Sequence, residues 1–235
     1  MTMTVWIIVG VIAFAVLLCF LLAVANFSGE RFFERFEEVN KIEVRGNHMP
    51  LKFVDDVNKN TFEGKLQVVQ ISGIATDAYS KGKLFLSTNT IGVNSIASYT
   101  IIAHEMGHAL QDKKGKKLKH MIALRRFGKF LGMLFAPSLI AGLVLLPFSY
   151  FTWAFVLFGL AGFILLLSLF VKLRTISIEK DASAKAVSFL NEYLTDNEMK
   201  IAKKFLKDAK LTYWADFLRT LLWWTGMSRK SKLFN

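Results

Sequence analysis

The sequence predicts a mainly α-helical membrane protein with an N-terminal transmembrane anchor, a transmembrane helical hairpin and a cytoplasmic α+β domain that contains a small β-hairpin. Two observations lead to this fold class. Hydrophobic residues make up 53% of the 235 residues, and 22 residues are Phe, whereas soluble domains are usually less apolar. In addition, two long stretches, 1–29 and 130–171, contain no Asp, Glu, Lys or Arg.

The first uncharged stretch predicts the anchor, which we place at 1–27. Residues 5–25 are long enough to cross a hydrocarbon core of about 30 Å as a helix. The alternative is a cleaved signal peptide, because Ala23, Val24 and Ala25 resemble a cleavage site. A basic segment does not precede the apolar run, and the run is longer than in typical signal peptides. We therefore favour an anchor that stays on the protein.

The second uncharged stretch predicts the helical hairpin at 130–172. It is too long for one span and suits two, at about 130–147 and 152–172. Pro147 and the aromatic residues that follow it divide the stretch, because proline interrupts a helix and aromatic side chains favour the membrane interface. Both spans belong to one domain unit that separates two soluble parts of the chain, 28–129 and 173–235.

The charges beside the hairpin predict its orientation. Residues 113–129 hold eight Lys or Arg and no acidic residue, and Lys172 and Arg174 follow the second span. Positive flanks stay in the cytoplasm, so both soluble parts are predicted there and the turn at 148–151 outside. The same arrangement explains the net charge of +12, and we expect no nucleic-acid partner. The single Cys19 excludes an intramolecular disulfide and a cysteine-based metal site.

The soluble parts show helical and strand patterns in order. The predicted helices lie near 29–41, 50–59, 95–111 and 176–190, with a further helix opened by the capping-box spacing of 195–198. Two strands joined by a turn are predicted at 65–72 and 82–87. The apolar segment 211–227 contains Asp216 and Arg219. If it crossed the membrane, the basic residues that follow it would lie outside the cell, against the positive-inside rule. We interpret it as a buried or interfacial helix.

The stretch IIAHEMGHALQ (101–111) carries the chemistry. On a helix, His104 and His108 are neighbours on one face and can direct both imidazoles at one metal ion. Glu105 is turned about 100° from His104, near the ion but free of it. This is the spacing of His-Glu-x-x-His peptidases, which bind zinc with the histidines and use the glutamate as a base. A chance match on a buried helix is the alternative, but buried imidazoles need polar partners.

A third metal ligand is expected, and three residues compete for this role. His120 lies in the lysine block, where it should face solvent, and His48 lies in a segment typical of a turn. Glu179 is the better candidate, because its helix face is otherwise small and apolar, although a surface glutamate paired with a lysine is the alternative. The hairpin also returns the chain to the side of the membrane that holds the histidines. Glu179 and the motif can therefore meet.

Four collinear stretches carry a family resemblance, namely IATDAYSKGKLFLS (74–87), SIASYTIIAHEMGHALQ (95–111), TISIEKDASAKA (175–186) and AKLTYWADFLRTLL (209–222). Through them the chain resembles the bacterial YugP-type neutral zinc metallopeptidases, small membrane proteins, and the histidine helix followed by a glutamate helix is similar to the gluzincin arrangement. The resemblance implies a zincin-like catalytic domain with one zinc per chain. It implies His104, His108 and Glu179 as ligands and Glu105 as the catalytic base.

The sequence departs from that pattern at two places. Related membrane gluzincins commonly have Asp four residues after the ligand Glu, where this chain has Ser183, while Asp181 stands at +2. Residues two apart on a helix face nearly opposite directions, so Asp181 is predicted to pair with Lys185 or to support the site, or else to replace Glu179 as the ligand. The family also tends to carry a histidine where this chain has Ala78.

The predicted activity is hydrolysis of peptide bonds in polypeptides, membrane proteins among them, by a protein seated in the lipid bilayer. Glu105 would take a proton from the attacking water and pass it to the leaving amine. Tyr213 is a candidate donor to the oxyanion, with an interfacial aromatic as its alternative role. The strand at 83–87 could bind substrate by strand addition if it lies at a sheet edge. Two other functions stay open: a non-catalytic membrane protein with structural zinc, and a zinc hydrolase of non-peptide amides.

Overall fold

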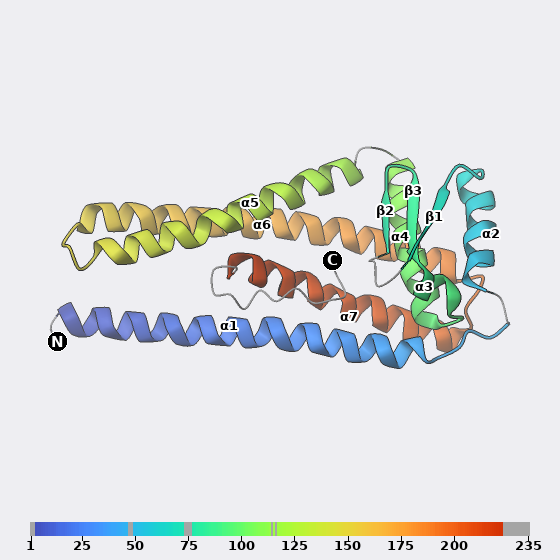
Figure 1. The fold of residues 1–235 in the computed structure, drawn as a ribbon, viewed down its shortest axis with the longest axis horizontal. Coiled ribbons are helices and arrows are strands. Elements are labelled where there is room, and N and C mark those ends of the chain that lie inside the picture. Colours follow the sequence, from blue (N-terminus) through green and yellow to red (C-terminus); the bar gives the residue numbers. More distant parts are fainter. Residues whose placement is uncertain (1–2, 47–48, 73–76, 114, 116, 223–235) are drawn as a thin grey trace.

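The computed structural model describes residues 3–46, 49–72, 77–113, 115 and 117–222. Its elements, in chain order, are α1 (Met3–Asn40), α2 (Pro50–Phe62), β1 (Gln67–Ile71), β2 (Ala78–Ser80), β3 (Lys83–Ser87), α3 (Thr88–Gly92), α4 (Ile96–Lys113), α5 (Lys117–Leu145), α6 (Phe151–Leu190) and α7 (Asp196–Leu221). The start of α1 and the turn between α5 and α6 lie at one end of the molecule, and the sheet with α2, α3 and α4 lies at the other (Figure 1).

The helices are longer than the sequence predicts. The expected anchor and the expected helix at 29–41 are one continuous helix, α1, and the expected helix at 176–190 is the last part of α6. The lysine block likewise belongs to α5 from residue 117 onward. Hydropathy marks where a helix leaves the apolar layer, but it does not mark a break, because backbone hydrogen bonds of a helix do not depend on whether its side chains face lipid or water. The predicted boundaries were therefore changes of environment, not ends of helices.

Two helices in the described part of the chain are long and apolar enough to cross a membrane: Lys119–Leu145 and Phe151–Leu190. They are antiparallel partners, and their shared seam buries Leu131, Ile164 and Val171. Large apolar side chains face outward from both helices, among them Phe130, Met133, Phe155, Phe163, Leu166 and Phe170. An outward apolar surface of this extent is what a hydrocarbon environment accommodates. The anchoring role of the first part of α1 stays a prediction.

The sheet differs from the predicted pair of strands. Its order is β1-β3-β2, with β1 parallel and β2 antiparallel to β3. The small β-hairpin therefore joins β2 and β3, and Lys81 and Gly82 at its turn both have positive φ angles, as a two-residue hairpin turn requires. The strands predicted at 65–72 and 82–87 do lie side by side, but they run parallel because β2 lies between them in the chain. β3 is also central, so the expectation that it offers a free edge is wrong.

The main hydrophobic core lies at the sheet end. It joins the end of α1, α2, β3, α4, the last turns of α6 and the first half of α7. Phe53 of α2 lies at its centre, with ring centroids 5.2 Å from Tyr99 and 4.8 Å from Tyr193. The predicted capping box opens α7, because Thr195 and Glu198 exchange side-chain and backbone hydrogen bonds. This core fixes α4 against α6, which is the contact that builds the site.

The last part of α7 contacts the helical hairpin. Leu221 and Leu222 are buried against Phe135 and Leu165 of α5 and α6. The expected helix at 211–227 is therefore the second half of α7 as far as Leu221, and residues 223–227 lie outside the described residues. α7 thus connects the sheet end of the molecule to the apolar hairpin.

Candidate metal centre

The two motif histidines lie together on α4, as their spacing predicts. Their ring centroids are 4.9 Å apart, and the rings are nearly perpendicular, at 82°. Ser95 caps the start of this helix, since its hydroxyl accepts from the backbone N–H of Ser98 at 3.1 Å. His108 is 5% exposed, and His104 is partly buried. Both imidazoles therefore need polar partners inside the protein.

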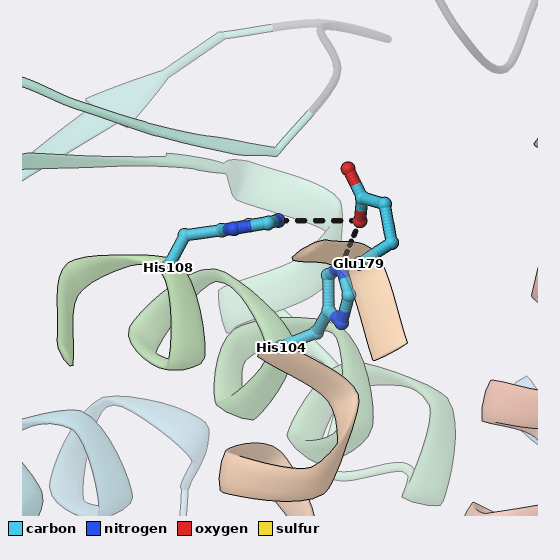
Figure 2. A group of neighbouring side chains, drawn as sticks. All are labelled: His104, His108 and Glu179. Atoms are coloured by element: carbon cyan, nitrogen blue, oxygen red, sulfur yellow. Dashed lines mark hydrogen bonds and ion pairs between the residues drawn. The ribbon is translucent and has the colours of Figure 1, made fainter. Parts of the chain in front are cut away.

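Glu179 of α6 supplies that partner, although it is 75 positions from His104 in the sequence. Its Oε2 atom lies 3.1 Å from Nε2 of His104 and 3.3 Å from Nε2 of His108. Figure 2 shows the two rings approaching this one oxygen from different directions. The carboxylate is 1% exposed. The three residues thus form a closed cluster of potential metal ligands, whose ligand atoms all lie within 4.8 Å of one another.

A glycine within the motif allows this approach. A Cβ atom on Gly107 would lie 2.4 Å from the carbonyl oxygen of Ala182, far inside van der Waals contact. The backbones of α4 and α6 are therefore packed directly against each other at the site. The sequence reasoning passed over Gly107, whose signal is a glycine in the interior of a predicted helix, where it costs stability unless packing requires it.

The charges around Glu179 keep it ionised. Burial raises the pKa of this carboxyl, but hydrogen bonds from His104 and His108 and the positive charges of His108 and Arg125 lower it well below its usual value. Arg125 of α5 forms an ion pair with the other carboxylate oxygen, Oε1. Burial likewise lowers the pKa of His108, yet the hydrogen bond to Glu179 and the charges of Glu105 and Glu179 raise it overall. The cluster is a strongly coupled set of charged groups.

Glu105 and Tyr213 also reach the site. Oε2 of Glu105 accepts a hydrogen bond from the backbone N–H of Tyr79 at 2.8 Å, so strand β2 holds this carboxylate. The hydroxyl of Tyr213 donates to Oε2 of Glu179 at 2.9 Å. Burial and the negative charge of Glu179 raise the pKa of Tyr213 well above its usual value. The phenol therefore remains a proton donor at neutral pH.

The competing ligand candidates lie elsewhere. His120 is exposed on α5 and does not join the cluster, and His48 lies outside the described residues. Asp181 is not among the three clustered ligand candidates. It forms an ion pair with Lys185 and accepts a hydrogen bond from Gln111 at 3.0 Å. Asp181 therefore belongs to the surroundings of the site.

Further contacts that the sequence did not predict complete the surroundings. Gln111 Oε1 lies 3.0 Å from Nδ1 of His108, and Ser183 Oγ lies 3.3 Å from Nδ1 of His104. Arg125 was also missed, because in the sequence it is one cation among the eight that flank the hairpin. Its only sequence signal is that the predicted motif helix and the basic segment are close in the chain, so that the first turns of α5 can lie near the motif histidines.

The donor set fits a zinc ion. Ligand atoms at about 2.0–2.1 Å from a tetrahedral ion lie about 3.3 Å from one another, which matches the 3.1 and 3.3 Å separations between the imidazole nitrogens and Oε2 of Glu179. Without a metal, hydrogens on the imidazole nitrogens bridge these separations, and a bound ion would take their place. Two histidines with one carboxylate are also the ligands of many catalytic zinc sites.

A scan against protein-family models matches residues 6–227 to the family described as "Putative neutral zinc metallopeptidase". The chain belongs to this family. The match covers nearly the whole chain, including the motif, the hairpin and Glu179. Searches among curated proteins and among solved structures gave no match. The family description names zinc and a peptidase, and the cluster of His104, His108 and Glu179 is the place in the described structure that suits them.

Proposed function

We propose that this protein is a membrane-bound zinc metalloendopeptidase of the gluzincin type, with one zinc held by His104, His108 and Glu179. The observation that carries the proposal is the convergence of both Nε2 atoms on Oε2 of Glu179 at 3.1 and 3.3 Å. The family membership supports it, because the family description names the same metal and reaction class. The spacing His-Glu-x-x-His adds a carboxylate beside the ligands, where hydrolysis needs a base.

When bound, zinc supplies Lewis acidity that polarises a carbonyl and lowers the pKa of water towards neutrality. Glu105 then takes a proton from the attacking water and passes it to the leaving amine. The N–H of Tyr79 orients this carboxylate, since it donates to Oε2 of Glu105 at 2.8 Å. Tyr213 keeps its proton and stands beside the ligand cluster, so it donates to the oxyanion that develops on the substrate.

Strand β2 is the proposed place for an extended substrate. β2 lies at the outer side of the sheet order β1-β3-β2, and it contacts α4 through the hydrogen bond between Tyr79 and Glu105. A peptide added along β2 would lie beside the metal cluster. β2 therefore takes the role that the sequence assigned to β3.

We propose that the membrane disposition follows the predicted one, with several spans in the cell membrane and the active site in the cytoplasm. Glu179 lies seven residues beyond Lys172 on one unbroken helix, which is about 10 Å at the rise of an α-helix. The cations Lys129, Lys172 and Arg174 lie between the apolar spans and the site. The catalytic cluster would thus stand close to the headgroups, within reach of cytoplasmic segments of membrane proteins.

Two other functions predict different behaviour. A structural zinc site usually has four protein ligands and needs no base beside them, whereas this cluster offers three ligands and Glu105. A hydrolase of non-peptide amides would use the same groups on another substrate. The decisive experiment compares wild type with Glu105→Gln, each purified with zinc, on a peptide library and on membrane proteomes. We expect Glu105→Gln to keep its zinc and its fold and to lose hydrolysis by several orders of magnitude.

Full activity in Glu105→Gln would remove Glu105 from the mechanism. If the wild-type protein does not bind zinc, the whole proposal fails. If zinc is bound and neither protein generates new peptide termini, the structural-zinc or amide-hydrolase function is the better one, and product identification with small amides separates those two.

A further inference from the structure

Gln111 lies three residues after His108 on α4 and is 1% exposed. Its side-chain amide contacts three groups. Nε2 donates to the backbone carbonyl of Ile178 at 2.8 Å and to Oδ2 of Asp181 at 3.0 Å, and Oε1 lies 3.0 Å from Nδ1 of His108. The amide therefore connects a candidate metal ligand on α4 with the backbone that precedes Glu179 on α6.

These contacts determine which way the amide faces. A backbone carbonyl can only accept hydrogen bonds, so the NH₂ group of Gln111 must face Ile178. The second amide hydrogen then meets Asp181, which is itself held by Lys185. The carbonyl oxygen of Gln111 is left to face His108. Because that oxygen can only accept, Nδ1 of His108 must carry the hydrogen. Nε2, the atom that faces Glu179, is then the nitrogen that can give up its hydrogen and bind a metal.

We propose that Gln111 is a positioning residue that fixes the tautomer and the ring orientation of His108 for metal binding, with Ile178 and Asp181 as its anchors on α6. The proposal rests on the proposed zinc site. A hydrogen bond to the second nitrogen of a metal-bound histidine orients the ring and raises its basicity as a ligand, and its removal commonly weakens metal binding about 10–100-fold. The anchors also make the position of His108 depend on α6, the helix that supplies Glu179.

The alternative is that Gln111 only holds α4 and α6 together and does not act on His108. Two substitutions separate the roles. Gln111→Met removes the acceptor for His108 and both bonds to α6 at similar volume. Gln111→Glu keeps an acceptor for Nδ1 of His108, loses both donors to α6 and places a negative charge beside Asp181. A positioning role predicts that zinc binds about 10–100-fold more weakly to Gln111→Met and that Gln111→Glu recovers most of that loss. If Gln111 only holds the two helices together, Gln111→Glu should bind zinc no better than Gln111→Met.

The hydrogen bond between Nδ1 of His108 and Gln111 can be observed without zinc. The chain has four histidines, so a histidine-labelled sample gives a simple ¹⁵N spectrum, and His108→Ala assigns the resonance. In the full-length wild type we expect the Nδ1–H proton of His108 to be protected from exchange with solvent, because it is bonded to Oε1 of Gln111. In Gln111→Met we expect that protection to be lost.

Each outcome bears on one proposal. Absence of a protected Nδ1–H proton on His108 in wild type overturns the positioning role. So does zinc affinity in Gln111→Met equal to that of wild type, or zinc affinity in Gln111→Glu no higher than in Gln111→Met. If wild type shows the protected Nδ1–H proton but binds no zinc, the proposed function fails while the assignment of the hydrogen bond stands. Thermal unfolding of the metal-free variants identifies any variant that has lost its fold, and zinc affinity is then compared between Gln111→Glu and wild type.

Discussion

Gly107 and Ala182 are in direct backbone contact: a Cβ atom at position 107 would lie 2.4 Å from the carbonyl oxygen of Ala182. This contact brings the helix with the two histidines against the helix with Glu179. A methyl group at this place cannot be accommodated by a side-chain rotation, because the atom it meets belongs to the backbone.

Gly107→Ala should therefore separate the two helices at the site. We expect a loss of stability of about 1–3 kcal/mol, as for other overpacked positions, together with a large loss of zinc affinity. Gly159→Ala is the matched control, because a Cβ atom there meets nothing within 4 Å. Thermal unfolding and zinc titration of both variants test this. Normal zinc affinity in Gly107→Ala would show that the helices can separate without disturbing the ligands.

Glu179 and Asp181 should behave differently on substitution. Glu179→Ala leaves two histidine ligands, so zinc affinity and activity should both collapse. Asp181→Ala removes one of the two anchors of Gln111 and the pair with Lys185, so we expect at most about a 10–100-fold loss and zinc still bound at stoichiometric concentrations. Zinc content and dissociation constants measured for both variants decide between them. If Asp181→Ala empties the site while Glu179→Ala keeps zinc, the ligand assignment is wrong.

Arg125 should support the metal ligand through its ion pair with Oε1 of Glu179. In Arg125→Ala we expect about a 10–100-fold weaker affinity for zinc, since the outer carboxylate oxygen loses the group that orients it. Arg126→Ala is the control, because Arg126 is the next residue, carries the same charge as Arg125 and is exposed. Competition with a chelator at two salt concentrations measures the effect. Tighter zinc binding in Arg125→Ala would mean that its charge opposes the metal.

Tyr213→Phe removes the hydroxyl that stands 2.9 Å from Oε2 of Glu179. If Tyr213 donates to the oxyanion, kcat should fall about 10²–10³-fold, with KM little changed because the bond forms in the transition state. Tyr150→Phe, in the exposed turn of the hairpin, should leave kcat unchanged. Steady-state kinetics with a cleavable peptide measures both. An unchanged kcat in Tyr213→Phe would leave Tyr213 as a structural partner of Glu179.

The orientation in the membrane can be read from single cysteines in a Cys19→Ala background. Phe148→Cys lies in the exposed turn between α5 and α6, and Lys200→Cys lies on an exposed face of α7. In intact cells we expect an impermeant thiol reagent to label position 148 and to label position 200 only after the cells are opened. Labelling at position 200 in intact cells would place the active site outside and favour the signal-peptide interpretation of the N-terminus.

The sequence predicts the chemistry of the site better than its shape. Helical spacing was enough to place His104 and His108 together, and the return of the chain through the hairpin was enough to suggest Glu179. The partners of these residues were not predictable in the same way. Gln111 and Arg125 are ordinary residues of a helix and of a basic segment, and their role depends on the tertiary contact between α4, α5 and α6. Such contacts leave no local pattern in a single sequence.

The fold shows the same division. The capping box at Thr195 and Glu198 and the helix that begins at Pro50 are local features, and the structure has both. The strand direction was wrong because the three-residue strand β2 is too short to give an alternating pattern. Its presence between β1 and β3 in the chain turns a presumed antiparallel pair into a parallel one.

One helix, α6, carries both the second span of the hairpin and Glu179, and the chain has no turn between them. Each residue added to a helix rotates all the residues beyond it by about 100° around the helix axis. Val171 packs against α5 and Ala182 packs against α4. Both ends of the segment 171–182 therefore have fixed partners. An insertion or deletion of one residue between them would rotate one set of contacts out of phase with the other. Length variation among relatives should therefore be excluded from this segment and confined to the connections between helices, where a change in length leaves every phase intact.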